Sequence, residues 1–395
     1  RFFVPWLNEA CLLLEDGVGT TAQIDAVACD AFRIGLGPFA LMNLTGPTIA
    51  LHSTDYLAEQ LDCPRFTGAA SLRALVEQGG MWEIGSDTDC DDGAARRIRK
   101  RLLGQAFAVA AQIVEEQICT MEDVDRGAKV GLRWSRGPFE IANRIGIAEA
   151  VGMARAYADE AGLVLPTWFA GRDTPFEFSY VDIEIDSGIA TVRLNRPEAM
   201  NALNVTLVSQ LGEAIDELNE RDDVSTIVLD GAGKAFVAGA DVKFFVDKIR
   251  QDSFQEVYDF TAHGHEVLNA IESSPKTTIA LATGLALGGG LELALACDYR
   301  VGTQRTQLRF PETSIGIYPG LGGTQRTTRI CGIGAARYAV LAGNFMDADT
   351  ASALGLLTHL VESSEVSVTV TELALAGKPD ERYPGRPTDA SNPVA

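Results

Sequence analysis

The spacing of apolar residues predicts helices in the first part of the chain. Near its start, Phe3, Leu7, Cys11 and Leu14 recur at intervals of three and four residues, which places them on one face of an amphipathic helix. Because Arg1 already lies within this pattern, we expect an N-terminal part to precede it in the natural protein.

The first part of the sequence repeats itself after one hundred positions. Each copy contains a helix, a short helix with an acidic cap (residues 21–28 and 121–128), a Gly-Pro-Phe turn and further helix. The residues that recur are Arg1 and Arg101, Glu15 and Glu115, Asp25 and Asp125, Gly37-Pro38-Phe39 and Gly137-Pro138-Phe139, Asn43 and Asn143, and Gly46 and Gly146. An internal period of this kind predicts a duplicated all-α unit.

Two stretches are expected to be linkers. Residues 61–95 end in an acidic, glycine-containing loop between the copies, and residues 163–177 combine prolines, a glycine and aromatic residues after the second copy. We therefore expect one helical repeat at residues 1–95, a second at residues 96–170, and a linker at residues 171–179.

From Tyr180 onward the pattern changes to alternating strands and helices. Residues 181–186 and 189–194 alternate between apolar and polar side chains around Ser187-Gly188, which predicts a β-hairpin. The next expected elements are a helix from Asn204 or Thr206 to Asn219, a buried strand at 224–229, a helix at 254–271, and strands at 279–282 and 299–301. This order predicts an α/β domain at residues 180–365, followed by a polar C-terminal tail at residues 366–395.

One glycine-rich stretch carries the candidate chemistry. The strand at residues 279–282 leads through Gly284 into Gly288-Gly289-Gly290 and then directly into an apolar helix. Glycines let a backbone approach a ligand closely, and the free N–H groups at a helix start favour a developing oxyanion. Glu292 lies in the first turn of this helix, and Glu312 follows twenty positions later. Two carboxylates around an oxyanion site indicate acid–base chemistry on an acyl group.

These residues resemble the enoyl-CoA hydratase (crotonase) superfamily. The resemblance extends from Tyr180 to Val361 and includes the motifs LNRPEAMNALN at 194–204 and KAFVAGADVK at 234–243. It implies the crotonase fold, an α/β spiral of ββα units, and a coenzyme A thioester as the substrate.

The resemblance also implies roles for individual residues. The backbone amides of Ala240 and Gly289 would form the oxyanion hole, and Glu292 and Glu312 would hold one water as base and acid. Gly320 would belong to the loop that supports the second glutamate. Contacts with coenzyme A are implied for Ala199, Met200, Ala202, Ala238, Asp241 and Val242.

Some positions depart from the family pattern or have a structural alternative. Glu198 replaces the family's lysine after Arg-Pro, which weakens the case for a phosphate contact there, and Lys243 is the candidate substitute. The glycines could instead serve close packing of a helix against a strand. Glu292 could be a first-turn glutamate favoured by the helix dipole, and Glu312 could be a solvated loop acid. The histidines at 263 and 265 are expected to be structural or exposed, so we expect no metal site.

The duplicated part resembles the C-terminal helical domain of 3-hydroxyacyl-CoA dehydrogenases. The shared features are the R-x-x-x-P-x-x-x-E-A helix at residues 1–10 and the Gly-Pro-Phe turn that follows it. In that family NAD binds a preceding Rossmann domain, and no G-x-G-x-x-G occurs in this chain. NAD is therefore expected only with such a domain, and dehydrogenase activity is not expected from this chain alone. Tandem copies followed by a crotonase domain resemble bifunctional 3-hydroxyacyl-CoA dehydrogenase/enoyl-CoA hydratase fusions.

Composition and charge narrow the expected partners. With 395 residues, 46% of them hydrophobic, the chain can bury large cores, and no apolar run reaches the roughly eighteen residues of a membrane span. A net charge of −21 disfavours binding to nucleic acid. Seven cysteines without paired spacing fit a reducing compartment, so we expect a cytoplasmic protein.

The expected function is reversible syn hydration of trans-2-enoyl-CoA to 3-hydroxyacyl-CoA in fatty-acid β-oxidation. An acyl-CoA is the expected substrate, and a homo-oligomer is the expected assembly. Two alternatives remain, an enoyl-CoA Δ3/Δ2 isomerase and a non-catalytic acyl-CoA-binding scaffold. Isomerases of the family often keep only the second acid, so the presence of both glutamates favours the hydratase.

Overall fold

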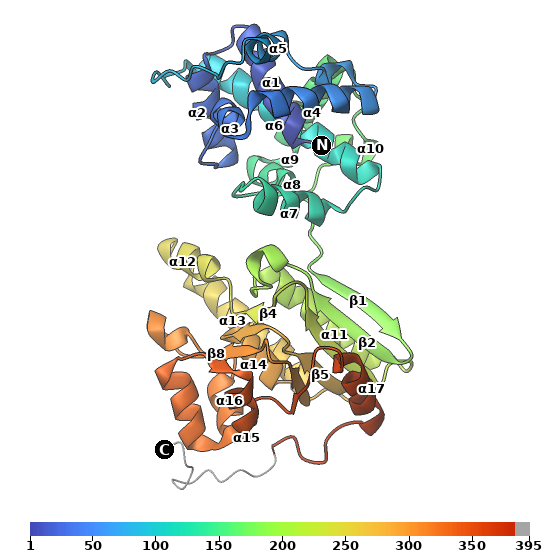
Figure 1. Cartoon of the computed structure of the whole chain (residues 1–395). Coiled ribbons are helices and arrows are strands. Elements are labelled where there is room, and N and C mark those ends of the chain that lie inside the picture. Colours follow the sequence, from blue (N-terminus) through green and yellow to red (C-terminus); the bar gives the residue numbers. More distant parts are fainter. Residues whose placement is uncertain (384–395) are drawn as a thin grey trace. The chain divides into compact units, whose positions relative to one another are not determined.

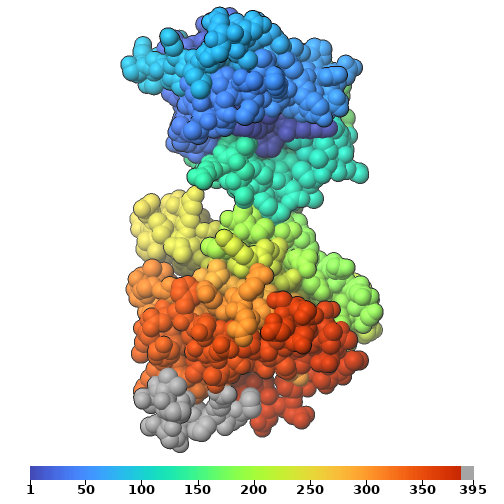
Figure 2. All heavy atoms as spheres, in the orientation of Figure 1, coloured from blue at the N-terminus to red at the C-terminus, as the bar shows by residue number. Residues whose placement is uncertain are grey.

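The computed structural model describes residues 1–383, which divide into two compact units. The first unit comprises residues 1–178 and the second begins at Ser179. Figure 1 shows helices in the first unit and strands with helices in the second, and Figure 2 shows the close packing of atoms within each unit. This division agrees with the all-α and α/β parts predicted from the sequence.

The first unit is built from helices alone. They are α1 (Phe3–Glu15), α2 (Thr21–Phe32), α3 (Pro38–Thr45), α4 (Pro47–Gln60), α5 (Ala70–Glu77), α6 (Asp92–Glu115), α7 (Met121–Gly131), α8 (Pro138–Ile145), α9 (Ile147–Ala161) and α10 (Thr167–Ala170), with a short 3₁₀ turn at Pro64–Phe66.

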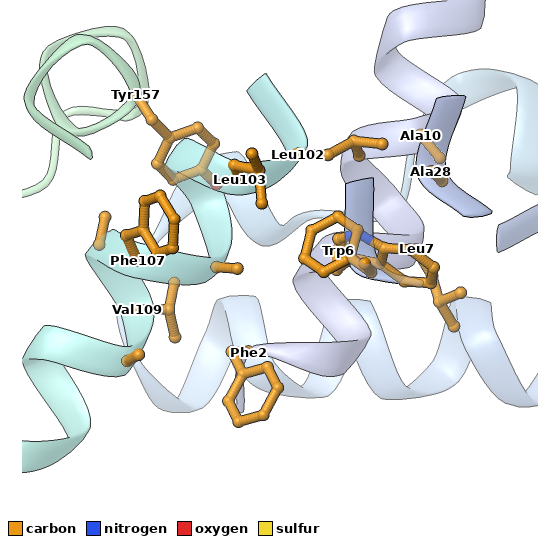
Figure 3. Close-up of a cluster of buried hydrophobic side chains, with 14 of the residues drawn as sticks. Phe2, Trp6, Leu7, Ala10, Ala28, Leu102, Leu103, Phe107, Val109 and Tyr157 are labelled. Carbon is orange, nitrogen blue, oxygen red and sulfur yellow. The ribbon is translucent and has the colours of Figure 1, made fainter. Parts of the chain in front are cut away.

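The two sequence copies share one hydrophobic core. Trp6 of α1 is fully buried, and its ring packs against Phe32 of α2 and Trp134 of the second copy. Figure 3 shows how Phe2, Trp6 and Leu7 lie in the same cluster as Leu102, Leu103 and Phe107. Each large apolar side chain buried in this way contributes roughly 1.5–3 kcal/mol of transfer free energy. The buried apolar residues of the two copies therefore form one continuous cluster.

The repeated aspartates have a different role from the one predicted. The expected acidic caps of α2 and α7 are wrong, because the cap side chains are those of Thr20 and Thr120. Asp125 is buried and accepts hydrogen bonds from the first N–H groups of α8, those of Phe139 (2.9 Å) and Glu140 (2.8 Å). Asp25 accepts the equivalent bonds at the start of α3. Each aspartate thus satisfies helix-start donors that have no intrahelical partner.

The two expected linkers are anchored to the helices at a few buried positions. Residues 61–95 contain the 3₁₀ turn and α5, and then return to Asn43 through its reciprocal hydrogen bonds with the backbone of Trp82. Asn143 forms the same pair of bonds with the backbone of Phe176, which lies in the core. The linker predicted at residues 171–179 is mostly exposed, but Phe176 and Phe178 pack against the helices, and the first unit ends at Phe178.

The second unit contains two mixed sheets. The larger sheet has the strand order β1-β2-β3-β5-β7-β10, and only the β1–β2 pair is antiparallel. The smaller sheet has the order β4-β6-β8-β9 and is parallel except for β8–β9. The strands are β1 (Val181–Asp186), β2 (Ile189–Leu194), β3 (Thr226–Gly231), β4 (Ala235–Ala238), β5 (Thr277–Leu281), β6 (Leu285–Leu287), β7 (Tyr299–Gly302), β8 (Gln307–Arg309), β9 (Met346–Asp347) and β10 (His359–Leu360). The predicted hairpin is confirmed, whereas the strand expected at 224–229 lies two residues later.

Three helices of this unit, α11, α12 and α16, begin at a capping side chain. Asn204 accepts a hydrogen bond from the N–H of Leu207, so α11 starts where the sequence predicted. The helices are α11 (Val205–Glu220), α12 (Val242–Arg250), α13 (Phe254–Glu272), α14 (Gly289–Leu295), α15 (Gly323–Arg337, interrupted at Gly332), α16 (Ala348–Ala353) and α17 (Val366–Ala376), with short helical turns at Pro197–Ala199, Glu312–Ile315 and Tyr338–Ala342.

The C-terminal stretch corrects the prediction of a polar tail at residues 366–395. Residues 366–376 form α17, whose Leu373 packs against Val228, Ile279 and Val301 of the larger sheet. Arg382 then pairs with the buried Asp298. Residues 366–376 are mainly apolar, and the polar residues that suggested a tail lie largely after them. The rest of the expected tail, residues 384–395, lies outside the described residues.

We predict that Asp125→Ala destabilises the helical unit by about 2 kcal/mol, because it leaves two N–H groups at the start of α8 without an acceptor. Calorimetric unfolding of the full chain measures this as a shift of the helical unit's transition. Asp159→Ala on the exposed face of α9 is the matched control. Equal transitions for the two variants would contradict the role given to Asp125.

Candidate active site

The candidate site lies at the start of α14. β6 ends at Leu287, and Gly288 turns the chain with φ +47° before α14 begins at Gly289. A Cβ atom on Gly290 would lie 2.0 Å from the carbonyl oxygen of Val237, so this glycine serves close packing of α14 against β4. Gly289 has more room, since the nearest atom to its Cβ position is 3.3 Å away. The packing alternative therefore holds for Gly290 and does not account for Gly289.

The two candidate oxyanion donors lie next to each other. A Cβ built on Gly289 would be 3.8 Å from the backbone nitrogen of Ala240. Leu203 pairs with Ala240 in a parallel bridge, which uses the carbonyl of Gly239 and the N–H of Asp241. In this pattern the N–H of Ala240 points away from Leu203, and the first N–H of a helix has no intrahelical acceptor. Neither amide donates in the hydrogen bonds described between backbone groups.

Glu292 is held by a turn that is distant in sequence. Its side chain is only 1% exposed, and Oε1 accepts hydrogen bonds from the backbone N–H groups of Leu321 and Gly323, both at 2.7 Å. None of the hydrogen bonds described for this residue uses Oε2. Burial raises the pKa of Glu292 to about 7, and the negative charge of Glu312 adds to this rise, whereas the two amides and Arg326 oppose it.

Glu312 lies opposite the turn at Gly288. Its side chain is 8% exposed, so the alternative of a solvated loop acid is wrong. A Cβ on Gly288 would lie 2.5 Å from Oε1 of Glu312, which shows how closely this carboxyl approaches the start of α14. Among the described residues, Oε2 has no hydrogen-bond partner. Burial raises the pKa of Glu312, so both candidate acids bind protons more tightly than they would in water.

The residues expected to contact coenzyme A come from two segments that lie side by side. Met200, which has φ +51°, accepts a hydrogen bond from the N–H of Ala238 at 3.0 Å. Asp241 caps α12 and forms an ion pair with Arg196 at 3.1 Å. The structure thereby brings Ala199, Met200 and Ala202 of the first segment close to Ala238, Asp241 and Val242 of the second. Lys243 lies on the exposed side of α12.

Three residues around the site were missed by the sequence analysis. Asn201 is fully buried and donates to the carbonyls of Ala232, Ala235 and Phe236, which fixes the stretch before the second segment. Arg196 donates to the carbonyl of Ala202 as well as to Asp241. Arg326 contacts the turn that holds Glu292. Asn201 and Arg196 belong to the LNRPEAMNALN motif, but their hydrogen bonds to distant segments leave no local signal.

Gly320 lies at the start of the turn that binds Glu292. The next residue, Leu321, donates one of the two hydrogen bonds to Glu292. The resemblance implied that this loop supports the second glutamate, Glu312. In the structure the turn donates its hydrogen bonds to Glu292, and Gly320 is not one of the donors. Its Cβ position has only the carbonyl oxygen of Tyr318 near it, at 3.8 Å.

The described residues contain neither a metal cluster nor a membrane helix. Within residues 1–383, no group of three or more His, Cys, Asp and Glu side chains could hold a metal ion. In the same range, no helix combines the length and apolar character that a transmembrane span requires.

Comparisons with known proteins divide the chain at the same place. A family model described as enoyl-CoA hydratase/isomerase matches residues 189–388. A model of the 3-hydroxyacyl-CoA dehydrogenase C-terminal domain matches residues 1–84 and 98–164, once in each copy. No match to a Rossmann domain was found.

Individual relatives match the second unit. The short-chain-enoyl-CoA hydratase of Clostridium acetobutylicum is 37% identical over 199 residues, which cover 50% of this chain and 75% of that protein. The crotonyl-CoA hydratase of Syntrophomonas wolfei is 36% identical over 198 residues, with the same coverage of 50% and 75%. A crystal structure of enoyl-CoA hydratase from Bacillus anthracis aligns with a TM-score of 0.47 and 31% identity, over 50% of this chain and 76% of that one.

We predict that Gly288→Ala destabilises the second unit by about 1–3 kcal/mol, because alanine disfavours φ +47° and its Cβ would collide with Glu312. Gly320→Ala is the control, since its Cβ position is nearly empty and its φ is not positive, and we expect a change within about 0.5 kcal/mol. Thermal unfolding compares the two variants. Equal stability would show that Glu312 does not lie against Gly288 in solution.

Proposed function

The chain belongs to the enoyl-CoA hydratase/isomerase family and carries a 3-hydroxyacyl-CoA dehydrogenase C-terminal domain ahead of that part, and from this premise we propose that it hydrates trans-2-enoyl-CoA thioesters. The observation that carries the proposal is the pair of buried carboxyls, Glu292 and Glu312, beside the start of α14. A hydratase needs two such groups, one to take a proton from water and one to supply a proton to carbon.

In the proposed reaction the thioester oxygen accepts hydrogen bonds from the backbone amides of Ala240 and Gly289. These donors stabilise the negative charge that develops on oxygen when a nucleophile adds to C3 of the enoyl group. Loss of one such donor typically costs about 3–4 kcal/mol of transition-state stabilisation. The proximity of the two amides supports this role.

We assign the base to Glu292 and the acid to Glu312. The two amides on Oε1 of Glu292 favour its carboxylate form, whereas one oxygen of Glu312 has no donor among the described residues. Water forms a bond to C3 while its proton passes to Glu292, and C2 receives the proton of Glu312. Addition of both groups from one face of the double bond gives the syn product, and proton exchange between the pair and solvent restores the starting state.

The substrate is proposed to be held by the two adjoining segments. Ala199, Met200, Ala202, Ala238, Asp241 and Val242 are the proposed contacts for coenzyme A, and Gly320 is a proposed support of the catalytic loop. Because the chain carries a net charge of −21, an anionic thioester has to be bound by backbone amides and local cations rather than by the overall field.

The wider role follows from the order of the domains. We propose a function in fatty-acid β-oxidation, in the cytoplasm and as a homo-oligomer, with NAD-dependent oxidation of the product only where a Rossmann domain accompanies this chain. We also propose that the two helical repeats end at residues 95 and 170.

Crotonyl-CoA is the substrate for the first test, through the loss of its conjugated thioester absorbance. We predict turnover by the parent chain and a reduction of about 10²–10⁴-fold in kcat for both Glu312→Gln and Glu292→Gln. Asp159→Ala, on the exposed face of α9, serves as a folded control. An isomerase would keep most of its activity on a 3-enoyl-CoA after Glu292→Gln, and binding without turnover by the parent would indicate a scaffold.

The pH dependence provides a separate prediction. Because Glu292 acts as the base, it has to be deprotonated in the free enzyme, and its pKa is raised from about 4.5 to about 7 by burial. We therefore expect kcat/KM to fall as the pH drops through about 7, in proportion to the remaining carboxylate. A rate that stays constant between about pH 5 and 8 would contradict this assignment.

A further inference from the structure

Arg326 binds the turn that holds Glu292, on the side opposite to that carboxylate. The Arg326 side chain is 3% exposed, and its Nη1 donates to the carbonyl oxygen of Leu321 at 2.8 Å. The N–H of the same residue, Leu321, donates to Oε1 of Glu292. One peptide segment therefore connects the guanidinium of Arg326 to the proposed base.

The turn is shaped to fit this contact. Gly322 has φ +96°, and a Cβ atom at that position would lie 2.4 Å from Nη1 of Arg326. Gly323 is equally confined, since its Cβ would lie 2.8 Å from Cγ of Glu292. The two glycines thus allow the backbone to pass between the arginine and the glutamate with both side chains in direct contact with it.

Arg326 is itself anchored on α13. Its Nε donates to Oε2 of Glu272 at 2.9 Å, and its Nη2 donates to Oδ1 of Asn269 at 3.1 Å. Tyr383 donates to the other oxygen of Glu272, and Arg382 donates to the backbone carbonyl of Glu272 at 2.6 Å. All three nitrogens of the guanidinium are engaged, so its orientation is fixed by partners on α13 and in the turn.

We propose that Arg326 is a positioning residue for the proton transfer, because it fixes the turn at Leu321–Gly323 so that both amides bind one oxygen of Glu292 and leave the other for water. This inference rests on the proposed function, since it concerns the same base. Arg326 does not touch the site of the substrate itself and acts only through the turn.

The charges around Glu292 determine how the loss of Arg326 would change the pKa of this glutamate. Glu292 faces the negative charge of Glu312 and the positive charge of Arg326. Burial acts to raise the pKa of Glu272, but the hydrogen bond from Tyr383 and the charge of Arg326 outweigh it and hold that pKa below its ordinary value. Loss of Arg326 would remove a positive charge and loosen two amide donors, and both changes favour the protonated form of Glu292.

The test compares Arg326→Met and Arg326→Lys with the parent and with Arg329→Met. Arg329 lies one turn further along α15, is exposed, and contacts the ring of Tyr383 but not the turn, which makes it a matched control. Glutamate labelled with ¹³C at the carboxyl carbon reports the titration of Glu292 by NMR in the full chain, with Glu292→Gln identifying its signal. This readout does not require turnover.

We expect Arg326→Met to raise the titration midpoint of Glu292 by about one pH unit and to move the acidic limb of kcat/KM by the same amount. The value of kcat should fall about 10–100-fold near neutral pH with little change in KM, and Arg326→Lys should recover part of both effects because it keeps the charge. Arg329→Met should match the parent.

Two outcomes separate this inference from the function on which it rests. If the parent does not hydrate crotonyl-CoA, the proposed function fails, while the NMR titration still tests the link between Arg326 and Glu292. If Arg326→Lys and Arg326→Met lower only the unfolding temperature and leave the titration midpoint and the pH profile unchanged, Arg326 is structural and the inference is overturned.

Discussion

A carboxylate removed from water requires hydrogen-bond donors, and this chain supplies them from the backbone in two different ways. Asp125 accepts one N–H group on each of its oxygens, so its acceptor capacity is directed entirely toward the start of α8. Glu292 accepts two N–H groups on the same oxygen, and its second oxygen has no bond among those described. The first arrangement stabilises a fold, and the second stabilises a charge while leaving an acceptor free for chemistry.

The second arrangement depends on the tertiary structure of the whole α/β unit. Glu292 belongs to α14, whereas its donors belong to the turn before α15, and the clamp on that turn belongs to α13. The segment that contains Arg382 and Tyr383 adds further contacts to α13 at Glu272. The geometry of Glu292 is therefore determined by four segments that are remote in sequence, and a local change in any of them can alter it.

Local patterns explain which parts of the molecule could be predicted from the sequence. The β1–β2 hairpin and the start of α11 at Asn204 follow from alternation and from a capping side chain, both of which act within a few residues. The glycines at 288–290 and the two glutamates were identified because their order along the chain is distinctive.

Long-range contacts account for what could not be predicted. α17 was assigned to the polar tail although it is rich in apolar residues, because the contact of Leu373 with the sheet has no local signal. The roles of Asp25 and Asp125 depend on helices that begin more than ten residues later. The sequence shows the glycines of the turn at Leu321–Gly323. It does not show that an arginine and a glutamate lie on the two sides of this turn.

In each helical copy, the side chain of an asparagine forms reciprocal hydrogen bonds with the backbone of a later aromatic residue, and this pairing closes the copy. Asn43 and Trp82 are 39 positions apart, whereas Asn143 and Phe176 are 33 apart, so the same closure spans segments of different length. The chain between the paired residues is thus fixed at both ends, and its length differs between the copies. Lengthening such a segment costs little additional closure entropy. The exposed stretch at residues 85–89 follows the first closure and precedes α6, so it lies outside the closed segment. A foreign peptide or a fluorescent domain can be inserted there with both copies still closed.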